Sequence, residues 1–128
     1  PWTSALEALA VPVPSLFDEQ ARHIGRAAGP VPEGDRTALG ESLATGANAV
    51  VVGGKRLVLG ATPNRVVLNA GLFEKCAKAF VIAASTGKPV RALPAWASAL
   101  WYERLRKDQV KAAAAHASGR VPDGMDAY

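Results

Sequence analysis

Two short β segments joined by a glycine pair, within residues 47–59, constrain the fold of this chain more than any other feature. Residues 47–52 read ANAVVV, an apolar run without alternation that is typical of a strand buried on both faces. After the turn Gly53-Gly54-Lys55, residues 56–59 (RLVL) are a second β segment. Two such segments around glycines predict a β-hairpin whose first strand lies inside the molecule.

The longest predicted helix comes directly after the hairpin. Thr62 is a good N-cap, and Pro63 fits the first helical turn. The helix should end before Gly87, which gives about 24 residues and a length of about 36 Å. Arg65 and Lys75 occupy other directions than its apolar side chains, and we expect the apolar face to cover the sheet. The apolar side chains recur at spacings of four and three: Val66, Ala70, Phe73, Ala77, Phe80 and Ala84.

Shorter helices are expected on either side of these elements. Residues 18–23 and 35–45 suit two brief helices, the second capped by Asp35. Residues 93–116 suit a C-terminal helix that either continues or restarts near its middle. Residues 2–10 suit a short helix before an extended, proline-containing segment.

These elements predict an α/β fold, a three-layer α/β/α-type domain with a β-sheet covered by the long helix. A length of 128 residues suits one domain. We expect this domain to span residues 1–117 and to be incomplete at its N-terminus. Residues 118–128 contain Gly119, Pro122 and Gly124 and are expected to form a flexible tail.

Composition favours a cytoplasmic protein. No apolar run approaches the roughly 18 residues that a membrane span needs, and the first residues lack the basic and apolar regions of a secretory signal. The single cysteine, Cys76, cannot form an internal disulfide, and a lone thiol is typical of a reducing compartment. We therefore expect a cytoplasmic location and no membrane partner.

The net charge of +4 points to an acidic partner. Basic residues are densest between positions 104 and 111, where Glu103 and Asp108 are interleaved with them. This pattern is typical of a solvated helix face, and no zinc-finger, RNP-like or helix-turn-helix signature accompanies it. We expect no nucleic-acid partner, and a small anionic metabolite is the preferred ligand.

The residues that commonly carry metal or nucleophilic chemistry are few. His23, His116 and Cys76 are far apart in sequence and show no Cys-x-x-Cys or His-x-His spacing, so no metal ligands and no metal cofactor are predicted within this chain. Cys76 lies among Phe73 and Phe80, which favours a buried core residue over a nucleophile. No catalytic residue is assigned.

Gly53, Gly54 and Lys55 are the candidate substrate-binding residues. Backbone N–H groups of a glycine turn and a lysine ammonium can together bind an anion. The turn lacks the spacing and the following Ser or Thr of a phosphate-binding P-loop, so a plain hairpin turn is the alternative. Flexible glycines, a cation and a sheet edge coincide only here.

Two further features have competing interpretations. Pro1 could be a catalytic base, as in tautomerase-like enzymes, but those enzymes continue as a strand whereas residues 2–7 look helical; otherwise Pro1 is simply where the chain was cut. Trp96, Trp101 and Tyr102 suit either core packing or an oligomer contact. A homo-oligomer is expected.

The order of elements resembles the class II aldolase/adducin family from just after that family's His-x-His-Pro metal segment. Residues 1–6 (PWTSAL) resemble the helix after those histidines, and residues 13–19 resemble the next extended segment. Residues 38–43 and 48–52 resemble the helix and strand before the family's Asn-His-Gly turn. Residues 57–60 and the long helix resemble the segments after that turn, so the resemblance ends near residue 87.

The resemblance implies a class II aldolase-type lyase, which performs aldol cleavage or decarboxylation of a small hydroxy or phosphorylated carbonyl compound in carbohydrate metabolism. In that family, zinc or another divalent metal is held by two histidines that would precede Pro1 and by a third from the turn between the strands. Here that turn is Gly53-Gly54-Lys55. The chain is therefore expected to be the C-terminal part of such a domain, and a non-catalytic, adducin-like binding or assembly module is the alternative.

Overall fold

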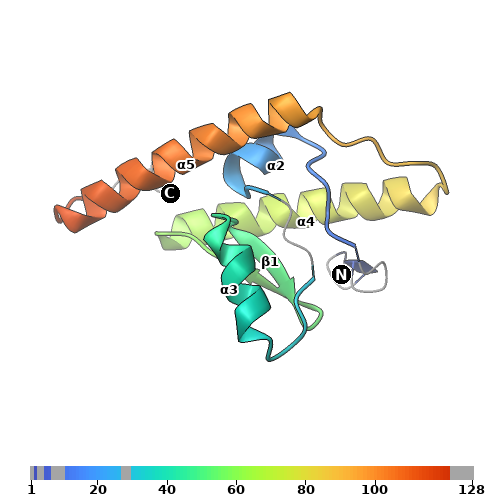
Figure 1. Ribbon diagram of the computed structural model, residues 1–128, viewed down its shortest axis with the longest axis horizontal. Coiled ribbons are helices and arrows are strands. Elements are labelled where there is room, and N and C mark those ends of the chain that lie inside the picture. The colour runs from blue at the N-terminus through green and yellow to red at the C-terminus, as the bar shows by residue number, and fades with distance from the viewer. Residues whose placement is uncertain (1, 3–4, 7–10, 27–29, 122–128) are drawn as a thin grey trace.

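The computed structural model describes residues 2, 5–6, 11–26 and 30–121. The described elements are the helices α2 (Asp18–His23), α3 (Arg36–Ala44), α4 (Pro63–Ser85) and α5 (Ala95–Ala117) and the strands β1 (Ala49–Val52) and β2 (Lys55–Val58). In Figure 1, α4 and α5 are two long rods with α2 between them. The hairpin lies against α4, and α3 lies beside the hairpin.

The two strands form an antiparallel hairpin in which Val52 lies opposite Lys55. Gly53 and Gly54 have φ angles of +51° and +72°, and a two-residue type I′ turn requires such left-handed values at both central residues. Val31 forms a parallel bridge with Val52 on the other side of β1. The predicted hairpin is confirmed, with Lys55 as the first residue of β2 rather than part of the turn.

Helix α4 begins where the sequence predicts. The Thr62 hydroxyl oxygen accepts a hydrogen bond from the Arg65 N–H at 3.3 Å, and Pro63 occupies the first turn. The inner face of α4 contacts both strands, which confirms that the long helix covers the sheet. Burial of the shared apolar cluster is the main stabilising contribution here. The buried members of this cluster are Leu6, Val13, Ile24, Ala49, Val51, Phe73, Cys76, Ala77 and Phe80.

Helix α5 packs against α2 through its inner face. Leu105 is fully buried there. Gly25 follows α2 with a φ of +89°, and a Cβ at this position would come within 3.2 Å of both Leu105 Cδ2 and the Gly46 carbonyl oxygen. The backbone conformation and the close approach of α5 therefore both require glycine. The helix is continuous through its middle, so of the two alternatives the unbroken one is right.

The fold class is confirmed as mixed α/β, with a two-stranded sheet in the described part of the chain.

One prediction for the long helix is wrong. Arg65 was expected to point away from the buried face, but it is only 2% exposed because α2 packs beside the first turn of α4. Residues 3–4 and 7–10 of the predicted N-terminal helix, and residues 122–128 of the predicted tail, lie outside the described residues. None of the described helices is long and apolar enough to cross a bilayer.

Replacing Leu105 by alanine is expected to lower the free energy of unfolding by about 2–5 kcal/mol, because it leaves a cavity at a fully buried site between α5 and α2. Val110→Ala is the matched control, since Val110 lies on the same helix and is 65% exposed. It should change the free energy of unfolding by less than about 0.5 kcal/mol. Urea unfolding followed by circular dichroism measures both variants, and equal effects would contradict the packing described for α5.

Candidate functional site

The three residues expected to bind substrate lie together at the tip of the hairpin. The Gly53 N–H donates to the carbonyl oxygen of Val31 at 3.0 Å, so the fold itself engages this amide. The Lys55 Nζ lies 3.5 Å from Glu33 Oε1, and the two side chains are 80% and 75% exposed. A Cβ at Gly53 would come within 2.8 Å of the Glu33 Cβ, so Glu33 packs closely over the turn. The tip therefore presents one ammonium group that faces a carboxylate in open solvent.

A second ion pair lies next to the tip. Arg56, which follows Lys55 on β2, places its guanidinium 2.9 Å from Glu74 Oε2 on α4. The other carboxylate oxygen of Glu74 accepts a hydrogen bond from the Trp2 N–H at 3.0 Å. Glu74 thus joins β2 to the N-terminal segment, and the charge of Arg56 is balanced within the fold.

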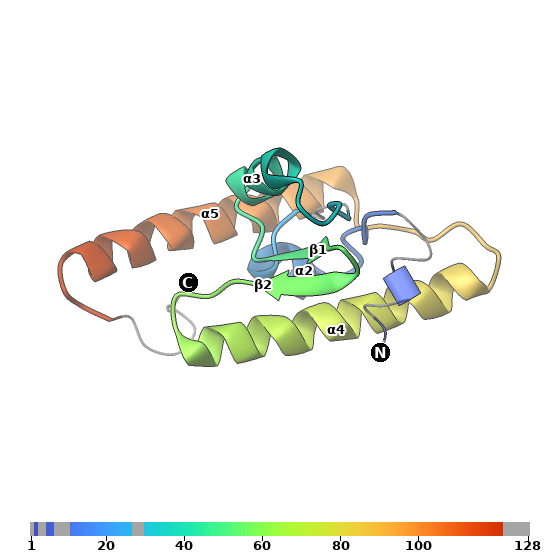
Figure 2. The ribbon, with the colours of Figure 1, turned by 90° about the horizontal axis from the view of Figure 1, so that it is seen from below.

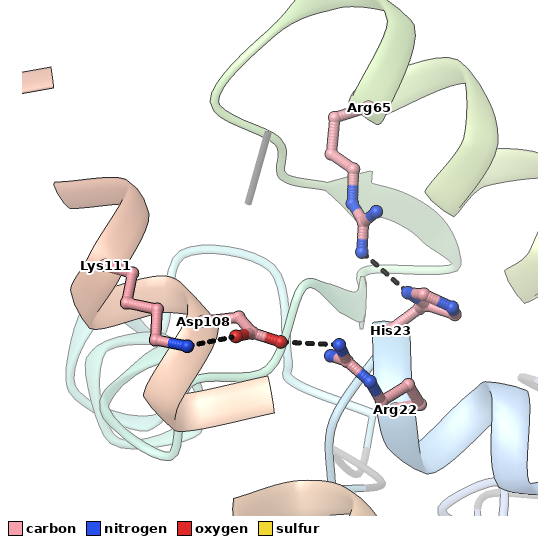
Figure 3. Close-up of polar contacts among 5 residues, drawn as sticks. All are labelled: Arg22, His23, Arg65, Asp108 and Lys111. Atoms are coloured by element: carbon pink, nitrogen blue, oxygen red, sulfur yellow. Dashed lines mark hydrogen bonds and ion pairs between the residues drawn. The ribbon is translucent and has the colours of Figure 1, made fainter. Parts of the chain in front are cut away.

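Helix α2 carries two adjacent side chains that reach in opposite directions (Figure 3). Arg22 forms an ion pair with Asp108 on α5, and Asp108 also lies 3.7 Å from the Lys111 Nζ. His23 turns toward α4, where its Nδ1 lies 2.8 Å from a terminal guanidinium nitrogen of Arg65. We call these five residues the polar cluster. Its contacts fasten α2 to both long helices.

The electrostatics of the polar cluster hold His23 neutral. A guanidinium can only donate hydrogen bonds, so the Nδ1 of His23 accepts from Arg65. The pKa of His23 is lowered from 6.5 to about 4, chiefly by burial and then by the positive charges of Arg65 and Arg22, against a smaller opposing effect of Glu19. The lone pair that could act as a base is therefore occupied by Arg65.

Cys76 is part of the core, as the sequence indicates. Its side chain is fully buried on α4. Burial raises the pKa of the thiol to about 11, with smaller effects of the neighbouring Lys75 and of Glu19. The thiolate, which is the nucleophilic form, is therefore scarce at neutral pH.

The described residues do not assemble a metal-ligand group. No three histidine, cysteine, aspartate or glutamate side chains lie together in the described ranges. His23 and Cys76 belong to different parts of the interior, since the first faces Arg65 and the second faces the hairpin core. Cations predominate in the polar cluster, whereas at the hairpin tip the Lys55 ammonium group faces the Glu33 carboxylate.

A hollow of about 380 Å³ lies where the end of α3, the start of β1 and α5 meet. Gln109 forms part of its lining, and its Nε2 donates to the Gly46 carbonyl and to the Asn48 Oδ1, each at 3.2 Å. Arg106 donates to the Gln109 Oε1 at 2.9 Å. The residues predicted to bind substrate do not line this hollow, whose polar groups hold α5 to the hairpin.

Two buried polar residues of α4 were not predicted from the sequence. Arg65 meets His23, and Asn69 is fully buried and donates from its Nδ2 to the Leu59 carbonyl at 2.8 Å. A signal was present, because Arg65 and Asn69 precede Phe73 at spacings of four and so share its helix face. The charge of Arg65, considered without this spacing, predicts a position on the solvent-exposed face of the helix.

Comparisons with protein-family models, with curated proteins and with solved structures give no match to this chain. Its function is therefore inferred from its own residues and from their geometry.

The state of His23 makes a pH-dependent prediction. Unfolded His23 takes up a proton near pH 6.5, whereas the folded residue does so only near pH 4, so between these values the unfolded chain binds more protons. The His23 contribution to stability is therefore complete above about pH 6.5 and is lost as the pH falls toward 4. His23→Gln should remove this part of the pH dependence.

Urea unfolding at a series of pH values tests this prediction. His116→Gln is the matched control, because it removes the other histidine of the chain from α5 and leaves the contact between His23 and Arg65 in place. A His23→Gln variant whose pH profile coincides with that of the unmodified protein would contradict the neutral state of His23.

Proposed function

We propose that this chain is the C-terminal part of a class II aldolase-type lyase domain, which cleaves or decarboxylates a small hydroxy or phosphorylated carbonyl compound. The observation that carries the proposal is the hairpin β1–β2 followed at once by the capped helix α4. The family has its histidine turn between two strands at this point, before a helix. The corresponding position in this chain is the Gly53-Gly54 turn with Lys55, the first residue of β2, directly after it.

The surroundings of the hairpin support a three-layer α/β/α arrangement. Helix α3 contacts β1, and α4 contacts both strands. Figure 2 draws α3 on one side of the hairpin and α4 on the other. Val50 and Val51 point to opposite faces of β1 because side chains alternate along a strand, and both are buried. A strand buried by helices on both sides is what the middle layer of such a domain requires.

The outer edge of β2 is suited to pairing with further strands of such a sheet. Val52 and Lys55 flank a two-residue turn and exchange hydrogen bonds, so the backbone groups of Arg56 and Val58 point away from β1. No described strand pairs with this edge, whereas Val31 already pairs along β1. We propose that strands of the upstream half of the domain pair there.

Zinc does not fit the residues of this turn, although the family resemblance implies it. Zinc is bound by thiolates, imidazoles and carboxylates, whereas Lys55 presents an ammonium group without a lone pair. The Lys55 ammonium group instead fits the phosphate or carboxylate of a small anionic metabolite. We assign Lys55 the role of binding the anionic part of the substrate, and no step is assigned to a metal at this turn.

Lys55→Ala is expected to weaken binding of dihydroxyacetone phosphate, a phosphorylated hydroxy carbonyl compound, by about tenfold or more, because a charge-assisted hydrogen bond is lost. Lys78→Ala is the matched control, since Lys78 is an exposed lysine of α4 outside the turn. Isothermal titration calorimetry measures both variants. Unchanged affinity in Lys55→Ala, or equal losses in the two variants, would remove the role given to Lys55.

Lys55→His tests the correspondence with the family's histidine turn. If the intact gene product supplies the two upstream histidines, this substitution completes a three-histidine set and should raise the affinity for zinc at least about tenfold. Val67→His, on the exposed side of α4, is the control for an added surface histidine. Zinc titration of both variants decides, and equal affinities would contradict the correspondence.

A non-catalytic, adducin-like binding or assembly module is the second candidate function. The exposed face of α4 favours it, because Val67, Leu68 and Ile82 are 72%, 44% and 48% exposed. Turnover of a hydroxy carbonyl compound by the intact gene product would exclude this alternative. A stable oligomer without turnover would support it.

A further inference from the structure

The outer face of α5 carries a regular stripe of exposed side chains, which we call the outer stripe. The opposite face holds the buried Leu105 and Ala112 against the rest of the molecule. Scattered exposed apolar residues are common on protein surfaces. A stripe in which residues recur at heptad spacing over three heptads is instead typical of helices that pair. The members of the outer stripe recur at spacings of four and three: Trp96, Leu100, Glu103, Lys107, Val110, Ala114 and Ala117.

The apolar members of the outer stripe are strongly exposed. Trp96 is 74%, Leu100 is 45% and Val110 is 65% exposed. Helix α5 lies at the edge of the molecule, and its outer side faces away from α2 (Figure 1). Covering this side with another apolar surface would therefore remove three large side chains from water.

The outer stripe is complementary to itself when a second copy runs in the opposite direction. With the two helices crossing near Leu105, Trp96 lies opposite the partner's Ala114, and Leu100 lies opposite the partner's Val110. Glu103 then lies opposite the partner's Lys107. A large side chain meets a small one, an apolar one meets an apolar one, and an acid meets a base.

We propose that two copies of this chain associate through antiparallel pairing of the outer stripes of their α5 helices. Each of these residue pairs across the interface occurs twice, once in each direction, as a twofold symmetric interface requires. The surface does not include the hairpin tip, so the inference does not rest on the proposed lyase function.

Charges beside the outer stripe limit the strength of the pair. Glu103 and Lys107 form an exposed ion pair at 2.8 Å within one helix, and they can exchange partners across the interface at little cost. Arg104 lies over the Trp101 ring, 4.9 Å from its centroid, beside the stripe. Arg104 and Arg106 of both copies come near the twofold axis, and their repulsion opposes association. The dimer should therefore be weak and depend on concentration.

The exposed face of α4 is a poorer surface for a second copy. Lys75 and Lys78 separate Val67 from Ile82 on that face. Antiparallel pairing of two α4 helices would place Lys78 opposite the partner's Gly71 and would bring the two Lys75 side chains together at the axis. This face offers no self-complementary set of layers.

Sedimentation velocity over a range of protein concentrations tests the proposal. The unmodified protein should change from monomer to dimer as its concentration rises. The double variant Leu100→Lys/Val110→Lys places two lysines opposite each other in both apolar layers, and it should weaken association by at least about tenfold. Leu100→Glu/Val110→Lys places opposite charges in the same layers and should retain the dimer.

Val67→Lys is the matched control, because it adds one lysine at an exposed apolar position of α4 and should leave the dimer unchanged. Circular dichroism verifies that each variant is folded. A protein that stays monomeric at every concentration overturns the proposal, and so does a dimer that persists in folded Leu100→Lys/Val110→Lys. Equal loss of the dimer in both double variants overturns the antiparallel register, because parallel pairing brings like charges together in each of them.

Discussion

The short helix α2 packs against both α4 and α5 and so connects the two long helices. A helix of this length is not stable by itself, so its conformation relies on tertiary contacts. Gln20 and Ala21 are buried, and Gln20 accepts from the Leu16 N–H and donates to the Pro14 carbonyl, each at 2.9 Å. Gly25 then lets Leu105 of α5 approach the backbone. Through α2, the C-terminal helix is joined to the core of α4 and the hairpin.

The polar cluster completes this connection. Arg22 reaches α5 and His23 reaches α4, so two neighbouring residues fix α2 relative to both long helices. A buried polar contact of this kind gives little net stability, but removing one partner leaves the other without its hydrogen bond. The lowered pKa of His23 is a consequence of this structural arrangement.

Local signals in the sequence were sufficient for the hairpin and for α4. Thr62 and Pro63 define the start of α4, and Gly53-Gly54 defines the turn, because each acts through residues only a few positions away. Long-range contacts were not predictable in this way. Arg22 and Asp108 are 86 positions apart, and the burial of Arg65 depends on α2 packing beside it. For the candidate site, the sequence suggests Lys55 but not its proximity to Glu33, which depends on how the segment around Val31 returns to β1.

We propose that the hairpin and α4 belong to the C-terminal part of a class II aldolase-type domain. The most direct test of this proposal is the N-terminal sequence and intact mass of the protein isolated from its natural source. We expect a mass larger than that of these 128 residues, with a His-x-His sequence immediately before Pro1. A mature protein that carries other residues at that position, or that starts there, would contradict it.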